Sequence, residues 1–352
     1  MNVNVFLLIF ILAIANYLVQ IRRDIKYLNY ILMGIMFCLC AFRMPWVGAD
    51  TYTYLQIYTN PTALESFKNE FIFYFLIKSL YGLNTPVWFT QIISTLLIYI
   101  PFGIVILRYS PKPSLSILIF VVASNNYFPE TFNITRQFIS TGFLLLSWVS
   151  FSKLNYKAGI IYFFIAIGFH STSIIYAPLA ILAFKTKYNI STTITIILVT
   201  LCFAFVFSSV SIITGAISKL GAFGMDKYSE YASYELGKSR TKFGLISDLL
   251  PVCTLGIYCL TQLKREKFLI KLFCTGLVCL NMVSVMPTAY RMLFGIISLE
   301  IILYPMCYVQ KSKYKWVISL LIIFLCVMWV YKMPFLEGAK LLPYESGVTY
   351  VR

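Results

Sequence analysis

Charged residues and histidine are scarce in this chain of 352 residues. Asp, Glu, Lys and Arg make up 12% of it, histidine occurs once, at position 170, and hydrophobic residues make up 60%. A water-soluble protein of this length could not cover so much apolar surface. Apolar runs recur along the chain, each about as long as the roughly 20 residues of helix that cross a bilayer. The sequence therefore predicts an all-α, polytopic integral membrane protein, with residues 1–352 forming a single membrane domain.

The sequence also lacks the motifs of metal and nucleotide sites. It has no Cys-x-x-Cys pair, no Cys/His cluster with ligand spacing, no Asp-x-Asp pair, no Walker motif and no Rossmann fingerprint. All nine cysteines lie inside apolar runs, where cysteine is most often a small packing residue. We therefore expect no metal site, no disulfide framework, no cofactor, and neither ATP nor a nucleotide sugar as substrate.

The net charge of +16 would suggest a nucleic-acid partner in a soluble protein, but its distribution indicates membrane orientation instead. Three longer segments, 43–70, 215–248 and 332–352, hold ten basic and nine acidic residues. Fifteen basic residues and two acidic ones lie in six short loops: 22–26, 108–112, 153–157, 185–187, 264–267 and 311–315. The positive-inside rule places the short loops in the cytoplasm and the longer segments outside, so we expect no nucleic-acid partner.

These loops divide the chain into about twelve membrane spans, with both termini on the outer side of the cytoplasmic membrane. The outer loops are then about 43–85 and 215–245. The expected spans are 3–20, 28–42, 86–107, 114–129, 136–151, 158–170, 172–184, 190–213, 246–263, 268–286, 291–309 and 316–331.

Two apolar regions do not fit the pattern of ordinary spans. Residues 71–83 contain Lys78, and crossing the membrane would turn every later basic loop outward, so we expect an interfacial or re-entrant helix. Residues 158–184 lie between two basic loops, which favours a hairpin over one span. Each leg has about 13 residues, or roughly 20 Å of helix, so the tip at 168–171 should lie inside protein or a wet cavity.

This topology brings five polar residues to the outer ends of different helices. They are Arg43, Asp50, Arg136, His170 and Arg291. Alone, each arginine is typical of a snorkelling anchor and the histidine of a hydrogen-bonded helix residue. Together they predict a site, and because arginine binds phosphate oxygens with two parallel hydrogen bonds, the cluster favours the diphosphate of a lipid carrier.

Four short motifs resemble those of the EpsG/Wzy polysaccharide polymerases. They are R-x4-G-x-D-x3-Y at positions 43–54, Arg136-Gln137 at the start of a helix, His170-Ser171, and Tyr290-Arg291 at the start of a late span. They occur in family order over about three quarters of the chain, and the tail segment LLPYESGVTY fits as well.

The resemblance implies a multi-pass, metal-independent membrane glycosyltransferase of O-antigen, lipopolysaccharide or related surface polysaccharide biosynthesis. It would join undecaprenyl-diphosphate-linked repeat units on the outer, periplasmic side of the inner (cytoplasmic) membrane, beside a Wzx-type flippase and a Wzz-type chain-length regulator. Arg136 and Arg291 would hold the diphosphate, and His170 would take the acceptor proton. Substrate-binding residues would be Arg43, Asp50, Tyr54, Gln137 and Tyr290.

Three other functions are alternatives to this one from the sequence. A flippase or transporter of lipid-linked oligosaccharides would also bind a diphosphate, but it would carry charges deep inside several spans. Here Glu300 and Lys271 are the exceptions in nearly charge-free spans, and we expect Glu300 to have an internal partner. An O-antigen ligase would differ mainly in its acceptor, and an O-acetyltransferase would need more than one histidine.

Overall fold

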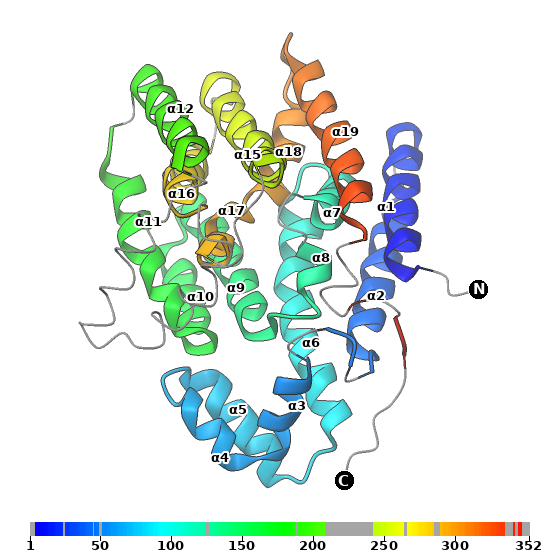
Figure 1. The fold of residues 1–352 in the computed structure, drawn as a ribbon. Coiled ribbons are helices and arrows are strands. Elements are labelled where there is room, and N and C mark those ends of the chain that lie inside the picture. The colour runs from blue at the N-terminus through cyan, green and yellow to red at the C-terminus, as the bar shows by residue number, and fades with distance from the viewer. Residues whose placement is uncertain are drawn as a thin grey trace.

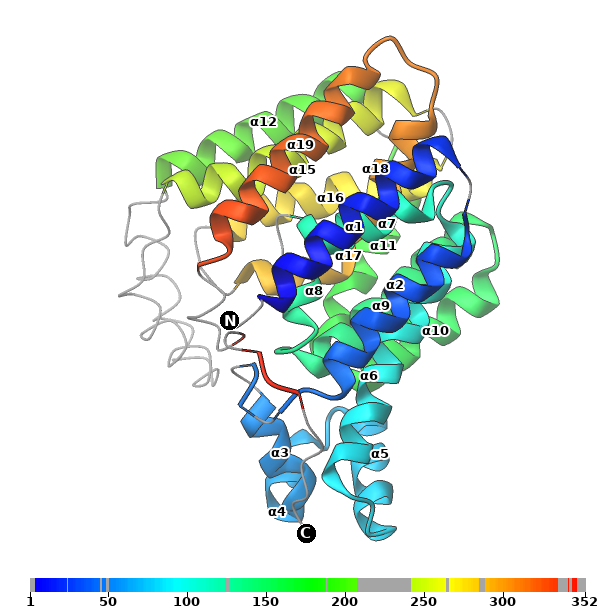
Figure 2. The same ribbon diagram turned by 90° about the vertical axis from the view of Figure 1, so that its right-hand side faces the viewer.

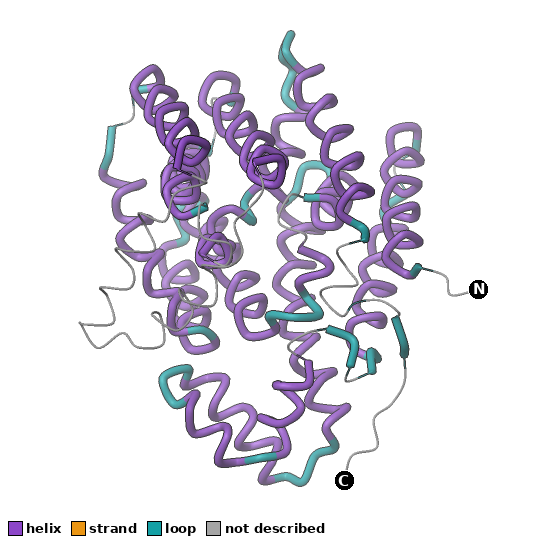
Figure 3. Tube along the Cα trace, in the orientation of Figure 1, coloured by secondary structure: helices purple, strands orange, loops and turns teal. Residues whose placement is uncertain are grey.

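Helices make up every regular element in the part of the chain that the computed structural model describes, as Figures 1 and 3 show. Within that part, one isolated bridge between Arg43 and Ser346 is the sole β-type pairing. The structure describes residues 4–23, 25–44, 46–48, 51–123, 127–187, 189–207, 242–263, 266–284, 289–334, 341 and 344–346. The predicted all-α class is therefore confirmed for these residues.

The helices differ widely in length. The α-helices are α1 (Val5–Arg22), α2 (Tyr27–Ala41), α3 (Thr51–Thr59), α4 (Pro61–Leu64), α5 (Phe71–Gly82), α6 (Val87–Ile104), α7 (Pro113–Val122), α8 (Tyr127–Glu130), α9 (Thr135–Ser152), α10 (Tyr156–Phe169), α11 (Tyr176–Lys185), α12 (Ile190–Phe207), α15 (Lys242–Gln262), α16 (Lys267–Val283), α17 (Phe294–Ile297), α18 (Glu300–Val309) and α19 (Lys315–Lys332). Short 3₁₀ turns are η1 (Glu65–Phe67), η3 (Ser171–Ile175) and η5 (Ala289–Leu293), and a π turn, η2 (Val105–Tyr109), extends α6.

Five helices in the described residues are long and apolar enough to cross a membrane. They are Val5–Arg22, Val87–Tyr109, Phe243–Gln262, Arg291–Val309 and Lys315–Lys332. Further apolar helices are shorter, such as α2 and α10. The chain is thus a helical membrane protein, while the number of twelve spans and the side on which the termini lie remain predictions.

One predicted span is wrong in its extent. We expected a helix over 114–129, but α7 ends at Val122 and α8 starts separately at Tyr127. The helix ends there because the backbone of the next residue, Ala123, leaves the helical region, with φ −54° and ψ 151°. The hydroxyl of Tyr127, at the start of α8, lies 2.6 Å from Oε1 of the fully buried Glu300, to which it donates a hydrogen bond. Tyr127 is therefore an internal partner of Glu300.

Helix α9 lies inside the bundle, and most of its side chains are buried. Its polar side chains have partners there: Ser147 donates to the carbonyl oxygen of Gly159 (2.8 Å), and Trp148 Nε1 donates to that of Gly295 (2.6 Å). Because hydrocarbon offers no hydrogen bonds, such residues are stable at membrane depth only when the protein supplies partners. Burial on all sides fixes α9, and with it the first turn that carries Arg136.

The basic loops meet at one end of the bundle. The ammonium group of Lys112 lies 5.1 Å from the ring of Tyr17 and 4.8 Å from that of Tyr308, and Lys153 lies 4.1 Å from the ring of Tyr109. Two hydrogen bonds, Ser312–Gln262 (2.9 Å) and Lys271–Thr186 (2.7 Å), attach the loops after α15 and α11 to their neighbours. In Figure 2 the α1–α2 and α18–α19 connections lie along one upper-right edge.

The predicted hairpin at 158–184 is confirmed. The rings of Tyr156, at the start of α10, and Phe184, near the end of α11, lie 6.2 Å apart, so the two helices run in opposite directions. The tip at His170 and η3 therefore lies away from the basic loops, at the other end of α10.

The apolar segment 71–83 forms helix α5 of 12 residues, which spans roughly 18 Å and is too short to cross a bilayer. With α3 and α4 it forms a layer at the lower end of the molecule in Figures 1 and 2. Within this layer α5 packs against α10, and the candidate site lies where the start of α5 meets the end of α10.

Candidate functional site

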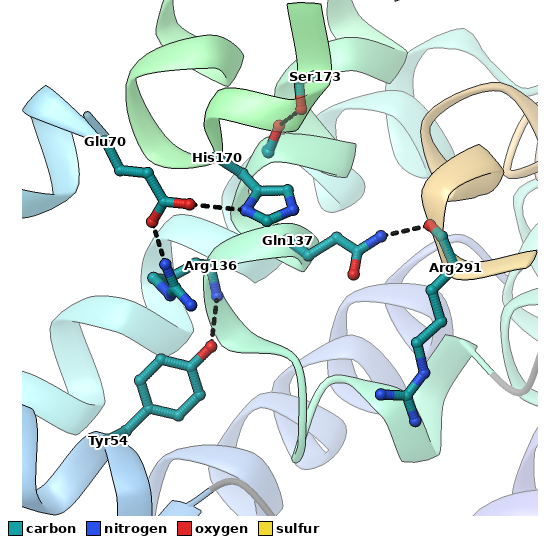
Figure 4. A network of polar contacts seen from close by, with 8 residues as sticks. Tyr54, Glu70, Arg136, Gln137, His170, Ser173 and Arg291 are labelled. Atoms are coloured by element: carbon teal, nitrogen blue, oxygen red, sulfur yellow. Dashed lines mark hydrogen bonds and ion pairs between the residues drawn. The ribbon is translucent and has the colours of Figure 1, made fainter. Parts of the chain in front are cut away.

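Glu70 joins two of the predicted site residues. Its Oε1 lies 2.9 Å from Nδ1 of His170, and its Oε2 forms an ion pair and hydrogen bond with Nη1 of Arg136 (Figure 4). The side chain of Glu70 is 8% exposed, against 20% for Arg136 and 21% for His170. One buried carboxylate thus holds the imidazole and a guanidinium at the end of the bundle where α5 begins.

The local sequence explains this meeting. Glu70 precedes the apolar run that forms α5 and is its N-cap residue, while His170 is the C-cap residue of α10. Gly168 lets these two helix ends come close, because a Cβ atom there would lie 2.4 Å from Cγ1 of Ile72. A larger side chain at position 168 would displace the side chains of Ile72 and Phe71 or push α10 away from α5.

Aromatic rings surround the guanidinium of Arg136. Its central carbon lies 4.1 Å from the centre of the Phe67 ring, 5.5 Å from that of Phe73 and 5.9 Å from that of Tyr54. Cation–π attraction strengthens when water is excluded. The backbone N–H of Arg136 also donates to the Tyr54 hydroxyl at 3.4 Å. Arg136 is therefore a partly desolvated cation whose position is fixed before any substrate arrives.

The charge of Glu70 follows from these neighbours. Burial alone would raise the pKa of its carboxyl group, but the hydrogen bond from His170 and the positive charge of Arg136 outweigh burial and lower the pKa below its ordinary value. The carboxylate is consequently ionised at neutral pH.

In Figure 4, His170 and Gln137 lie between Glu70 on one side and Arg291 on the other. Nη2 of Arg291 is 3.6 Å from Oε1 of Glu130, and the backbone carbonyl oxygen of Arg291 accepts a hydrogen bond from Nε2 of Gln137. The side chain of Arg291 is 35% exposed. Arg136 and Gln137 are adjacent in α9, and Gln137 links them to the backbone of Arg291 in η5. The guanidinium groups of Arg136 and Arg291 lie apart in Figure 4.

Arg43 is 4% exposed and is engaged by its own segment. Nη1 donates to the carbonyl oxygen of Cys40 at 2.5 Å, Nε donates to Thr51 Oγ1 at 3.3 Å, and the guanidinium lies 5.6 Å from the ring centre of Phe132. Arg43 and Tyr54 border a polar cavity of about 10 Å³, roughly the room that one water molecule needs. Arg43 therefore lies behind Tyr54 as seen from Arg136, and its contacts are with residues other than Glu70, Arg136 and His170.

The segment after Arg43 turns tightly at Gly48. This residue has φ +100°, and a Cβ atom there would lie 2.6 Å from the carbonyl oxygen of Phe132. Glycine is required for both reasons. The C-terminal residues 344–346 pair with the same segment: the N–H of Met44 donates to the carbonyl oxygen of Glu345 at 3.0 Å, and Trp46 Nε1 donates to its carboxylate at 2.9 Å.

Two predicted site residues are not placed by this geometry. Asp50 lies outside the described residues, as does the side chain of Tyr290. Among the residues that are described, no group of three or more His, Cys, Asp or Glu side chains is arranged to hold a metal ion.

Glu70 and Glu130 are site residues that the sequence reasoning missed. The signal was present: the chain has only 13 acidic residues, and arginines on the outer face need partners. In the predicted topology both glutamates fall in connections on the outer side, where such partners were to be sought. The sequence pattern does not show which acid pairs with which base, because Glu70 is 66 residues from Arg136 and 100 residues from His170.

Comparison with known proteins gives one family. The model of the EpsG family matches residues 26–346, which include the Arg43, Arg136, His170 and Arg291 segments. No curated protein and no solved structure matches the chain. A match over nine tenths of the chain, together with the clustered residues, leads to one conclusion: this protein belongs to the EpsG family.

Proposed function

We propose that this protein polymerises lipid-linked oligosaccharide repeat units at the outer side of the cytoplasmic membrane. Membership of the EpsG family indicates a polysaccharide-polymerase role. The observation that carries the finer proposal is the shared carboxylate of Glu70, which keeps a cation suited to phosphate, Arg136, and an imidazole base, His170, in one contact chain.

The proposed reaction transfers a glycan from undecaprenyl diphosphate to a sugar hydroxyl. The oxygen of the acceptor hydroxyl, on a second undecaprenyl-diphosphate repeat unit, forms a bond to the donor's anomeric carbon. The bond between that carbon and the diphosphate oxygen breaks, and undecaprenyl diphosphate leaves with the bonding electron pair. His170 accepts the hydroxyl proton, which makes the oxygen a stronger nucleophile.

Arg136 and Arg291 would stabilise the leaving diphosphate. Charge develops on the diphosphate oxygens as the glycosidic bond breaks, and preorganised cations in a water-poor site stabilise such charge strongly. Arg136 meets this description, since aromatic rings and Glu70 hold it in place. Arg291 is more exposed and is reached through Gln137, so it suits the solvent side of the diphosphate.

The other predicted residues would support this centre. Tyr54 fixes the backbone at Arg136, and Arg43 adds positive charge behind Tyr54. Asp50 would orient Arg43 or a sugar hydroxyl, and Tyr290 would bind substrate. A Wzx-type flippase would deliver the repeat units, and a Wzz-type regulator would set chain length.

The experiment is polymerisation of a purified, radiolabelled undecaprenyl-diphosphate repeat unit by the full-length protein in lipid vesicles. We expect a ladder of products whose formation His170→Ala and Arg136→Ala abolish and the exposed control Arg108→Ala leaves intact. Movement of substrate across the bilayer without release of undecaprenyl diphosphate would contradict the proposal in favour of a flippase. Single transfer to an unrelated acceptor would contradict it in favour of a ligase.

A further inference from the structure

His170 has two ring nitrogens in different environments. Nδ1 faces Oε1 of Glu70 at 2.9 Å, and no hydrogen bond to Nε2 occurs within the described residues. A carboxylate without a proton has only acceptor oxygens, so a hydrogen bond between the two groups requires a proton on Nδ1. In a neutral imidazole the other nitrogen then carries the lone pair.

We propose that Glu70 is a positioning residue that holds His170 in the tautomer with its proton on Nδ1, leaving Nε2 free to accept a proton. That this proton comes from the acceptor hydroxyl rests on the proposed glycosyl transfer. The tautomer of His170 is independent of that proposal. Glu70 would act through His170 and would not touch the reacting atoms.

Three observations support this role. The Glu70 side chain is 8% exposed, and its contacts with His170 and Arg136 lower the pKa of its carboxyl group, so that it is ionised. Its second oxygen is held by Arg136, so two contacts on different helices fix the plane of the carboxylate. The N–H of Ser173 donates to the backbone carbonyl oxygen of His170 at 3.0 Å, and Ser173 Oγ lies 2.6 Å from Oγ of Ser140 in α9, which anchors the turn that carries the imidazole.

The other ionisable groups near this centre have separate partners. On α5, Lys78 donates to the Tyr74 hydroxyl, which donates to Glu65. On α11, the Tyr176 hydroxyl accepts from the N–H of Gly295 and donates to the Met292 carbonyl. Arg291 pairs with Glu130, and the Tyr54 hydroxyl accepts from the backbone of Arg136. Glu70 is thus the one acid among the described residues that contacts the imidazole.

The chain has a single histidine, so nuclear magnetic resonance of the full-length protein labelled with ¹⁵N-histidine gives one pair of ring signals. At a pH where the imidazole is neutral, we expect the wild-type protein to carry the proton on Nδ1. In Glu70→Gln the proton should redistribute toward Nε2, because an amide can donate as well as accept. Glu70→Asp, which keeps the carboxylate, should retain part of the Nδ1 preference.

Glu65→Gln is the matched control, because Glu65 is an exposed acid five residues earlier and should leave the tautomer unchanged. A wild-type protein with its proton on Nε2, or an unchanged tautomer in Glu70→Gln, would overturn the proposal. In the vesicle assay Glu70→Gln should lower kcat about 10–100-fold with a smaller change in KM, since a wrong tautomer removes much of what a general base contributes.

The two proposals fail in different ways. Loss of the Nδ1 preference in Glu70→Gln, with no polymer from the wild-type protein, would refute the glycosyl transfer and keep the positioning role. Polymer from the wild-type protein with a tautomer independent of Glu70 would refute the positioning role alone.

Discussion

Replacing Arg136 with methionine tests whether this residue is a structural part of the site as well as a candidate ligand for phosphate. Methionine keeps apolar contact with Phe67 and Phe73 but removes the positive charge. Glu70 then stays buried with His170 as its one neighbour of potential positive charge.

The expected loss of stability follows from burial. Removing one partner of a fully buried ion pair costs about 3–5 kcal/mol. Because the Arg136 side chain is 20% exposed, water screens part of this interaction, and about 2–3 kcal/mol is the better figure. The lost cation–π contacts add about 0.5–1 kcal/mol. A total of about 3 kcal/mol corresponds to a fall in Tm of about 6 °C, taking about 2 °C per kcal/mol for a large domain.

The assay can use the protein's own cysteines. All nine are free, and Cys40, Cys253, Cys259, Cys274 and Cys307 are buried, so a thiol-reactive fluorogenic dye reports unfolding of the purified protein in detergent. Arg108→Met is the matched control, because Arg108 is exposed at the basic end, and its Tm should change by less than about 1 °C.

The reasoning also predicts coupling between Arg136 and Glu70. Glu70→Gln removes the charge that Arg136→Met leaves unpaired, so the double variant should be more stable than the sum of the two single effects by about 1 kcal/mol or more. Equal Tm values for Arg136→Met and Arg108→Met, or additive effects in the double variant, would refute the account of a buried, coupled pair.

Three further predictions concern topology, packing and pH. Single cysteines in a cysteine-free background should react with an impermeant reagent in intact cells at position 83, in the α3–α5 layer, and not at position 155 or 187; the reverse pattern would invert the orientation. Gly168→Val should lower polymerisation at least about tenfold by separating α10 from α5, whereas Gly34→Val, where a Cβ has open space, should not. Folding lowers the pKa of Glu70, so the ionised carboxylate stabilises the folded protein fully above about pH 4.3, and this stabilisation is lost as the pH falls through the lowered pKa. Below about pH 4.3 the Tm should therefore fall less steeply in Glu70→Gln than in the wild-type protein.

The sequence was sufficient for features that depend on local pattern. The short helix at 71–83 followed from its length and Lys78, and the hairpin around His170 followed from the basic loops that flank it. The break between α7 and α8 was missed, because apolar residues on both sides of Ser-Asn-Asn continue a helical hydropathy pattern. The pairings of Glu70 with His170 and of Tyr127 with Glu300 could not be predicted, because they depend on how distant helices pack and on close approaches such as that of Gly168 to Ile72.

The pairing of residues 344–346 with the Arg43 segment bears on how the protein is made. Trp46 and Glu345, which hydrogen-bond through their side chains, are 299 residues apart in sequence. Synthesis proceeds from the N-terminus, so Arg43 enters the membrane long before the ribosome reaches Glu345. The hydrogen bonds of Met44 and Trp46 with Glu345 can therefore form only after nearly all the helices have been made. A chain that ends before position 344 would leave Met44 and Trp46 without these partners.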